Sequence, residues 1–172
     1  YQHYGVVPDL VTLGKPMGNG HHVAGVIARP DLMSAFRNQV MYFNTFGGNP
    51  VSCAVGKAVL DVIKDEDLMS NARVVGDYVI AGLHRLQGKH EIIGDVRGRG
   101  LFFGAELVRD RKTREPATDE TKRLVNSMRE RGVLLSRIGQ FDNVLKMRPP
   151  MSFSRDNADL LLQTLDEALS AL

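Results

Sequence analysis

The stretch PDLVTLGKPMGNG, residues 8–20, places a lysine between a short apolar run and a turn with three glycines. Residues 9–13 follow Pro8 and are bounded by turn residues, which predicts a short buried strand. Lys15 is then either a solvated turn residue or an amine held at the end of that strand. Because desolvation and neighbouring positive charges lower the pKa of an amine, the held lysine could form a Schiff base with an aldehyde cofactor.

The Gly14-Lys15 pair does not belong to a P-loop. That motif needs Ser or Thr after the lysine and a second glycine five residues before the first. Here Pro16 follows the lysine, and Asp9 stands five residues before Gly14. A nucleotide-binding P-loop domain is therefore excluded.

A second loop reads NTFGGNP, residues 44–50. Thr45 offers a hydroxyl, and Gly47 and Gly48 offer unhindered backbone N–H groups just before a predicted helix. This combination suits a phosphate, because helix N-termini and successive N–H groups bind anions. Gly-Gly pairs are also common in ordinary turns, so the motif alone leaves both interpretations open.

Caps and apolar spacing predict the helices. Asn49 and Pro50 predict an N-cap followed by a proline in the first turn. The i, i+3, i+4, i+7 spacing behind them predicts an amphipathic helix through Ile63, and similar spacing predicts another from Leu68 to a C-cap at Gly88. Further helix starts are predicted at Asp31, Thr118 and Ser154.

Strands alternate with these helices. They are predicted at residues 23–28, 101–108, 133–137 and 144–148, and residues 109–118 read as a solvated connector. The mixture of strands and helices along the whole chain predicts an α/β fold.

Two motifs in the C-terminal half carry arginines or lysines. In NVLKMRPPMSF, residues 143–153, Lys146 and Arg148 lie two positions apart on a predicted strand and so share a face. An inward pair would bind a carboxylate or phosphate, whereas an outward pair would be the polar face of an edge strand. In GDVRGRGLFFG, residues 94–104, the glycines indicate backbone crowding or positive φ and not catalysis. Arg97 and Arg99 could point to a ligand, but such arginines are more often structural ion-pair partners.

Composition narrows the functional classes. Lys and Arg number 22 against 20 Asp and Glu, so charge gives no case for a nucleic-acid or membrane partner. Cys53 is the only cysteine, which excludes an intrachain disulfide framework and fits a cytoplasmic setting. No metal site is expected, no signal peptide is recognised at the N-terminus, and no apolar run reaches the ~18 residues that span a bilayer.

Taken together, four motifs resemble the class III aminotransferases, which are pyridoxal-5′-phosphate (PLP) enzymes of fold type I. They are PDLVTLGKPMGNG, YFNTFGGNPVSCAVGKAVLDVI, GDVRGRGLFFGAEL and LKMRPPMSFS, in that order. The resemblance implies that Lys15 is the Schiff-base lysine and that Thr45, Phe46 and Gly47 contact the cofactor. It also implies a homodimer, because the family's threonine usually reaches the phosphate of the neighbouring subunit's cofactor.

Within that family the motifs look most like the ethanolamine-phosphate and phosphohydroxylysine phospho-lyases. Aminotransferases usually place an arginine where this chain has Lys146, in order to grip a substrate carboxylate. A lysine is a point charge and not a bidentate fork. The resemblance thus implies a small primary amine as substrate, with Lys146 and Arg148 binding it. A Lys15 aldimine would lead either to amino transfer to a keto acid or to β-elimination of phosphate.

The resemblance also implies a domain arrangement. Residues 1–64 are expected to be the end of the large PLP-binding domain, residues 65–90 a connecting helix, and residues 91–172 the small C-terminal domain. The family's phosphate loop, ring-stacking aromatic residue and pyridinium-pairing aspartate would precede residue 1, so the chain alone is expected to be incomplete. The alternative is a non-catalytic dimerisation or regulatory module, or an inactive fragment.

Overall fold

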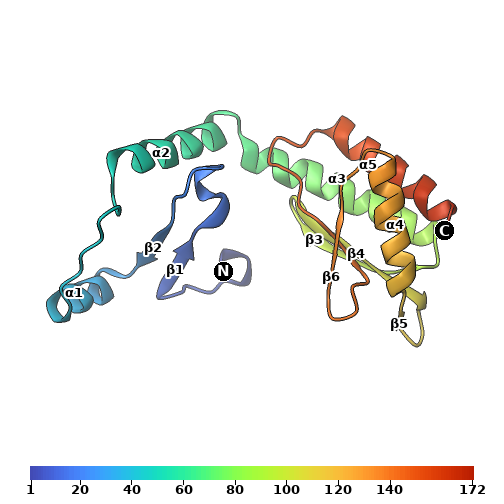
Figure 1. Cartoon of the computed structure of the whole chain (residues 1–172), viewed down its shortest axis with the longest axis horizontal. Coiled ribbons are helices and arrows are strands. Elements are labelled where there is room, and N and C mark those ends of the chain that lie inside the picture. Colours follow the sequence, from blue (N-terminus) through green and yellow to red (C-terminus); the bar gives the residue numbers. More distant parts are fainter. The chain divides into compact units, whose positions relative to one another are not determined.

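The computed structural model describes residues 1–172, which form two compact units, Tyr1–Glu66 and Asp67–Leu172 (Figure 1). Each unit has its own sheet. The helix Leu68–Lys89 lies within the second unit. The functional division into large domain, connecting helix and small domain stays a prediction.

The first unit is built around a two-stranded antiparallel sheet. Its elements are η1 (Gln2–Tyr4), β1 (Leu10–Leu13), η2 (Lys15–Gly18), β2 (Gly25–Ala28), α1 (Pro30–Gln39) and α2 (Pro50–Asp65). The prediction that the strand before Lys15 is buried is wrong in this structure, since Leu10 and Leu13 of β1 are 57% and 39% exposed. The physical reason is that β1 pairs only with β2 and forms no larger sheet.

Local capping chemistry explains where the helices of this unit begin. Asn49 caps α2, because its Oδ1 accepts the Ser52 N–H at 2.9 Å, and Pro50 occupies the first turn. Both predictions are therefore confirmed. The predicted cap at Asp31 is wrong: α1 begins at Pro30, and Asp31 lies in its first turn, where it pairs with Arg29 at 2.8 Å.

The second unit has a five-stranded antiparallel sheet. The main order is β3 (Ile93–Arg99), β4 (Phe102–Asp110), β7 (Val144–Met147) and β6 (Ser136–Ile138), with β5 (Glu115–Pro116) paired to β4. The helices are α3 (Leu68–Lys89), α4 (Thr118–Glu130) and α5 (Arg155–Ser170). The strand β5 was not predicted; it lies within the stretch expected to be a solvated connector.

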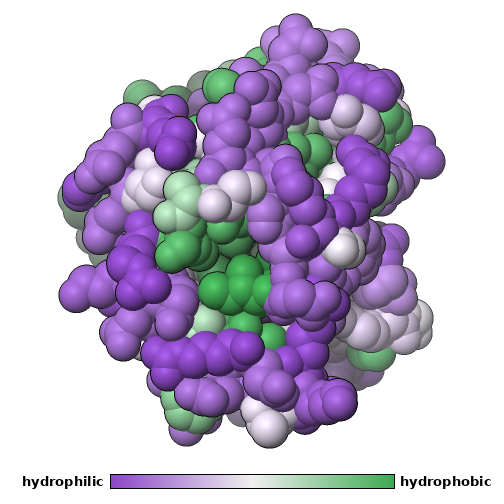
Figure 2. Space-filling view, turned by 90° about the vertical axis from the view of Figure 1, so that its right-hand side faces the viewer, coloured by the Kyte–Doolittle hydropathy of each residue, from purple (hydrophilic) through white to green (hydrophobic).

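The helices α3 and α4 pack against this sheet, and α5 packs against these two helices. The fully buried side chains that fill the core include Val79, Leu83, Ile93, Phe103, Leu107, Leu124, Leu145 and Leu165. Figure 2 shows a mainly hydrophilic face of the molecule with a small apolar area near its centre.

Caps in the second unit also follow the sequence. Ser154 caps α5 through a capping box with Asn157, as predicted, and Thr118 begins α4. Gly88 is not the C-cap of α3, because the helix continues to Lys89 and His90 takes that position.

Asp166 ties α5 to the end of α3. Lys89 Nζ lies 2.7 Å from both of its carboxylate oxygens, and His90 Nε2 lies 2.6 Å from Oδ1. These hydrogen bonds, the one from Lys89 first, lower the pKa of Asp166 below its usual value. A lowered folded-state pKa contributes stability above the unfolded pKa and loses it as the pH falls.

We therefore expect Asp166→Asn to lower the free energy of unfolding at neutral pH, and the loss to shrink below about pH 4, where an unfolded aspartate becomes protonated. Urea unfolding between neutral and acid pH measures this. Asp77→Asn, at an exposed position of α3 without an ion pair, is the control. An equal loss for Asp166→Asn at every pH would contradict the assignment.

Candidate functional site

Lys15 begins the short helix η2, directly after β1. Its side chain is exposed and makes no ion pair. Its backbone has φ of 50°, in the left-handed region that non-glycine residues seldom adopt. Such a conformation costs about 1–3 kcal/mol and is concentrated at functional sites. The strained position singles Lys15 out from ordinary turn lysines.

The turn that carries Lys15 packs on α2. A Cβ on Gly18 would lie 3.0 Å from Val23, and one on Gly56 of α2 would lie 3.6 Å from the same side chain. His21 Nε2 lies 2.8 Å from Ser52 Oγ in the first turn of α2. The Lys15 turn is therefore fixed against the start of that helix.

The loop with Thr45 is organised by Asn44. Its Oδ1 accepts the backbone N–H groups of Phe46 and Gly47 at 3.1 and 2.9 Å. The Thr45 hydroxyl is exposed and makes no hydrogen bond, and Gly48 takes a φ of 71°. The Gly47 N–H that the sequence offers to a phosphate is thus occupied by Asn44, whereas the Thr45 hydroxyl is free.

The predicted residues of the first unit are linked only indirectly by hydrogen bonds. No hydrogen bond joins Lys15 to Thr45, Phe46 or Gly47. Both segments instead bond to the first residues of α2. The sequence analysis did not identify Asn44, His21 or Ser52. Asn44 could have been recognised as an asparagine before a turn, because such a side chain often accepts backbone N–H groups two or three residues ahead.

Lys146 and Arg148 lie in the second unit, at alternating positions of β7 and just beyond it. Leu145 and Met147, which alternate with them along the chain, are buried, so the two cations are on the side of the strand away from the core. Neither pairs with a carboxylate, and the Arg148 guanidinium lies 5.8 Å from the Phe102 ring. In the structure these two predicted residues are therefore neighbouring positive charges without acidic partners.

Both residues also line a cavity of about 630 Å³. Its other lining residues come from the segment before β6, from β6, from β7 and the segment after it, and from α5, and include Leu134, Ser136, Phe153, Asn157 and Leu160. A concave, mixed apolar and cationic surface of this kind suits a small anionic ligand. Arg97, by contrast, pairs with Asp95 and Glu106, which confirms its predicted structural role.

No helix of the structure is long and apolar enough to cross a membrane.

Three known proteins illustrate what the chain is similar to. Alanine–glyoxylate aminotransferase 2 homolog 2, mitochondrial, from Arabidopsis thaliana is 46% identical over 172 residues, which is 100% of this chain and 36% of that protein. A phospholyase from Arthrobacter, solved in complex with phosphoethanolamine, has a TM-score of 0.97 and 49% identity, and the match covers 100% of this chain and 41% of that one.

The third is an amine transaminase from an uncultivated Pseudomonas species, solved in its PLP-bound form. It has a TM-score of 0.87 and 32% identity, and the match covers 99% of this chain and 40% of that one. The fold-type-I prediction is confirmed by these structures, and the family implies PLP as cofactor.

The chain spans 36% to 41% of the length of these proteins. The profile of the family described as Aminotransferase class-III matches residues 1–169, nearly the whole sequence. The chain therefore belongs to the class-III aminotransferase family.

Proposed function

We propose that the protein is a PLP-dependent phospho-lyase that releases phosphate from a small phosphorylated primary amine such as phosphoethanolamine. The observation that carries this proposal is the pair Lys146 and Arg148, two cations without acidic partners that line one cavity. A phosphate dianion is bound well by two cationic side chains, here a lysine ammonium and an arginine guanidinium. The similarity to the Arthrobacter phospholyase supports the same substrate class.

Lys146 favours elimination over amino transfer for a chemical reason. Amino transfer needs a second substrate, usually a keto acid, whose carboxylate must be held, and arginine holds a carboxylate by two parallel hydrogen bonds. Phosphoethanolamine has no carboxylate, so a phospho-lyase does not need an arginine at this position. Amino transfer remains the second candidate, supported by the relative named as an alanine–glyoxylate aminotransferase.

The residues of the first unit fit the cofactor. The Lys15 amine is exposed and unpaired, and the Thr45 hydroxyl is free to donate to a phosphate oxygen. PLP, when bound, supplies an aldehyde for amines and a ring that accepts electrons. Lys15 would hold the aldehyde until the substrate amine replaces it. The freed amine would then remove the proton from the substrate carbon that bears nitrogen, while phosphate leaves the next carbon.

The reaction is tested with the full-length protein, by measuring inorganic phosphate released from phosphoethanolamine or 5-phosphohydroxylysine without any keto acid. We expect phosphate release, and little amino exchange between alanine and several keto acids. Lys146→Ala should weaken apparent substrate binding about tenfold to a hundredfold. Lys122→Ala, at an exposed position of α4, is the control. Efficient amino exchange without phosphate release would instead identify an aminotransferase.

Thr45 should contribute directly to cofactor affinity. Thr45→Val keeps the side-chain shape and removes the hydroxyl, so one hydrogen bond to a charged acceptor is lost. The expected cost is about 1.5–3 kcal/mol, or roughly tenfold to a hundredfold in the Kd for PLP. Equilibrium titration with PLP measures it. Thr12→Val, on an exposed position of β1, should leave the Kd unchanged, and an unchanged Kd for Thr45→Val would remove Thr45 from the site.

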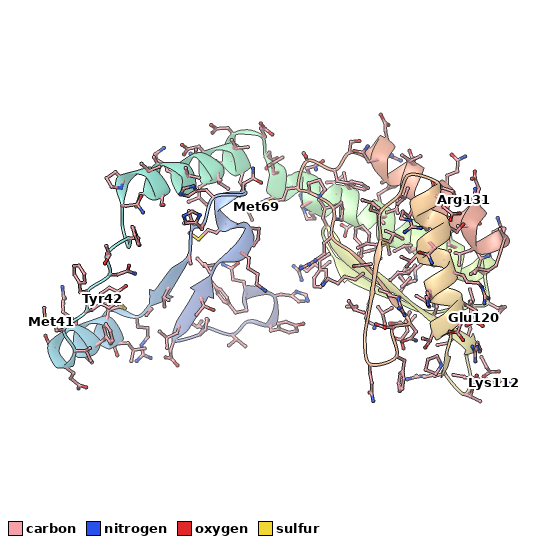
Figure 3. All side chains as sticks on the ribbon, viewed as in Figure 1. Met41, Tyr42, Met69, Lys112, Glu120 and Arg131 are labelled. Atoms are coloured by element: carbon pink, nitrogen blue, oxygen red, sulfur yellow. The ribbon has the colours of Figure 1, made fainter.

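We also propose a homodimer. The segment after α1 is apolar and open: Met41, Tyr42, Phe43 and Phe46 are 96%, 67%, 79% and 79% exposed. Figure 3 shows Met41 and Tyr42 close to α1. Exposed apolar stretches of this kind mark interaction surfaces. Sedimentation of the full-length protein should give twice the monomer mass, and Phe43→Ser should shift it toward the monomer.

The alternative of a non-catalytic module is less well supported, because the family profile runs through residues 1–169 and the lysine motif is present. The cytoplasmic location stays a prediction. The Arabidopsis thaliana relative is named mitochondrial, so fractionation of cells that make the full-length protein is the relevant test.

A further inference from the structure

We propose that His21 is a positioning residue that couples the turn bearing Lys15 to the loop bearing Thr45, through hydrogen bonds at the start of α2. The inference rests on the proposed function, which gives these two segments their roles. It concerns only residues of the first unit.

The coupling is a chain of three contacts. His21 Nε2 lies 2.8 Å from Ser52 Oγ. Asn49 Nδ2 donates to the same Ser52 Oγ at 3.0 Å and to the Phe46 carbonyl at 2.8 Å. His21, Ser52 and Asn49 are all partly buried, so water competes less for these bonds than it would at the surface.

Each end of the chain is anchored next to a proposed cofactor-binding residue. The His21 backbone N–H donates to Gly18 O at 3.0 Å, which ties the imidazole to η2, the helix that Lys15 begins. At the other end, Phe46 adjoins Thr45, and the Asn49 backbone N–H also donates to Phe46 O at 3.3 Å. A shift of either segment would therefore lengthen a bond in the chain.

The hydrogen bonds also fix the orientation of the Asn49 amide. Ser52 N–H donates to Asn49 Oδ1 at 2.9 Å, so the amide nitrogen of Asn49 faces Ser52 Oγ as a donor. Ser52 Oγ retains one proton and one further lone pair, so it bonds to His21 Nε2 in either neutral tautomer of the imidazole. The neighbouring His22 ring stacks on His21 at 4.6 Å and restrains its plane.

The test uses the full-length protein and two readouts. Amide hydrogen exchange of residues 44–49, without cofactor, reports how well the loop is held. Borohydride reduction over a range of PLP concentrations, followed by peptide mass mapping, gives the concentration that half-labels Lys15. The variants are His21→Ala, Ser52→Ala, their combination, and His21→Gln, with Cys53→Ala, exposed on α2, as control.

Each single alanine variant should speed exchange of the loop about tenfold and raise the half-labelling concentration by a similar factor, the effect of one hydrogen bond. The double variant should be no worse than either single one, because both break the same chain. His21→Gln, whose amide can reach Ser52, should restore most of the affinity, and Cys53→Ala should change neither readout.

The proposal is overturned if His21→Ala leaves loop exchange unchanged, if labelling stays unaltered while exchange rises, or if the two alanine effects add in full. Failure of the proposed function is distinguishable, since unmodified protein would then show no label on Lys15 at any PLP concentration.

Discussion

Lys15→Ala is expected to lower the turnover of the full-length protein by about 10²- to 10⁴-fold, the range typical for loss of a general base. The amine that this substitution removes is the one assigned to hold the aldehyde and to take the substrate proton. Borohydride reduction of the protein with PLP should label Lys15 in the unmodified protein and leave no labelled peptide in the variant. Lys64→Ala, an exposed and unpaired lysine of α2, should retain turnover and label.

Two substitutions of Lys15 can distinguish the loss of its amine from the strain of its left-handed backbone. With φ of 50°, alanine at this position keeps the left-handed strain, whereas glycine relieves it. Lys15→Gly should therefore be more stable to urea than Lys15→Ala by about 1–2 kcal/mol, while both lose the same activity. Label on another lysine, or turnover that follows stability across the two variants, would contradict the assignment of Lys15.

Gly76→Ala is expected to be the most destabilising small substitution in the second unit. Gly76 lies on α3, where a Cβ would stand 2.1 Å from the carbonyl oxygen of Gly100 and 2.3 Å from its carbon. Gly100 has φ of 51° in the two-residue turn between β3 and β4, so the obstacle is backbone that cannot rotate away. Overpacking of this kind should cost about 3 kcal/mol in the free energy of unfolding.

Gly88→Ala on the same helix is the matched control. A Cβ there has no atom within 4 Å, and the residue is exposed near the end of α3. Alanine should stabilise the protein by up to about 0.5–1 kcal/mol, because glycine loses more backbone entropy in a helix. Urea unfolding of both variants measures the contrast. Equal stability of Gly76→Ala and the unmodified protein would show that the close approach of α3 to the β3–β4 turn is not required.

Many correct predictions of the fold depended on residues that lie close together in the sequence. Asn49 with Pro50, Thr118 and Ser154 each mark a helix start, because a cap or first-turn signal depends on residues only a few positions away. The crowding predicted from the glycines of residues 94–104 is also confirmed. A Cβ on Gly94 would stand 2.6 Å from Val108, and one on Gly98 would stand 2.5 Å from Phe103.

Two predictions of local structure were wrong, for different reasons. Asp31 was expected as a cap, but Pro30 begins α1 and Arg29 holds Asp31 in its first turn. Glu115 and Pro116 form β5 because β4 extends to Asp110 and offers them an edge, which the polar composition of residues 109–118 does not reveal. The Asp31 error was local, since Pro30 suits the first position of a helix, whereas β5 depends on the neighbouring strand β4.

The sequence by itself determined the family, the lysine and threonine motifs, the spacing of Lys146 and Arg148, and most helix starts, since these depend on residue identity and short-range order. Only the tertiary structure decided which groups are covered and which are free. In the structure β1 is exposed, and the Gly47 N–H donates to Asn44 Oδ1. Lys146 and Arg148 line a cavity and have no acidic partner. The structure also joins His21 to Ser52, 31 residues away. Such contacts depend on packing between segments distant in sequence, and no local pattern encodes them.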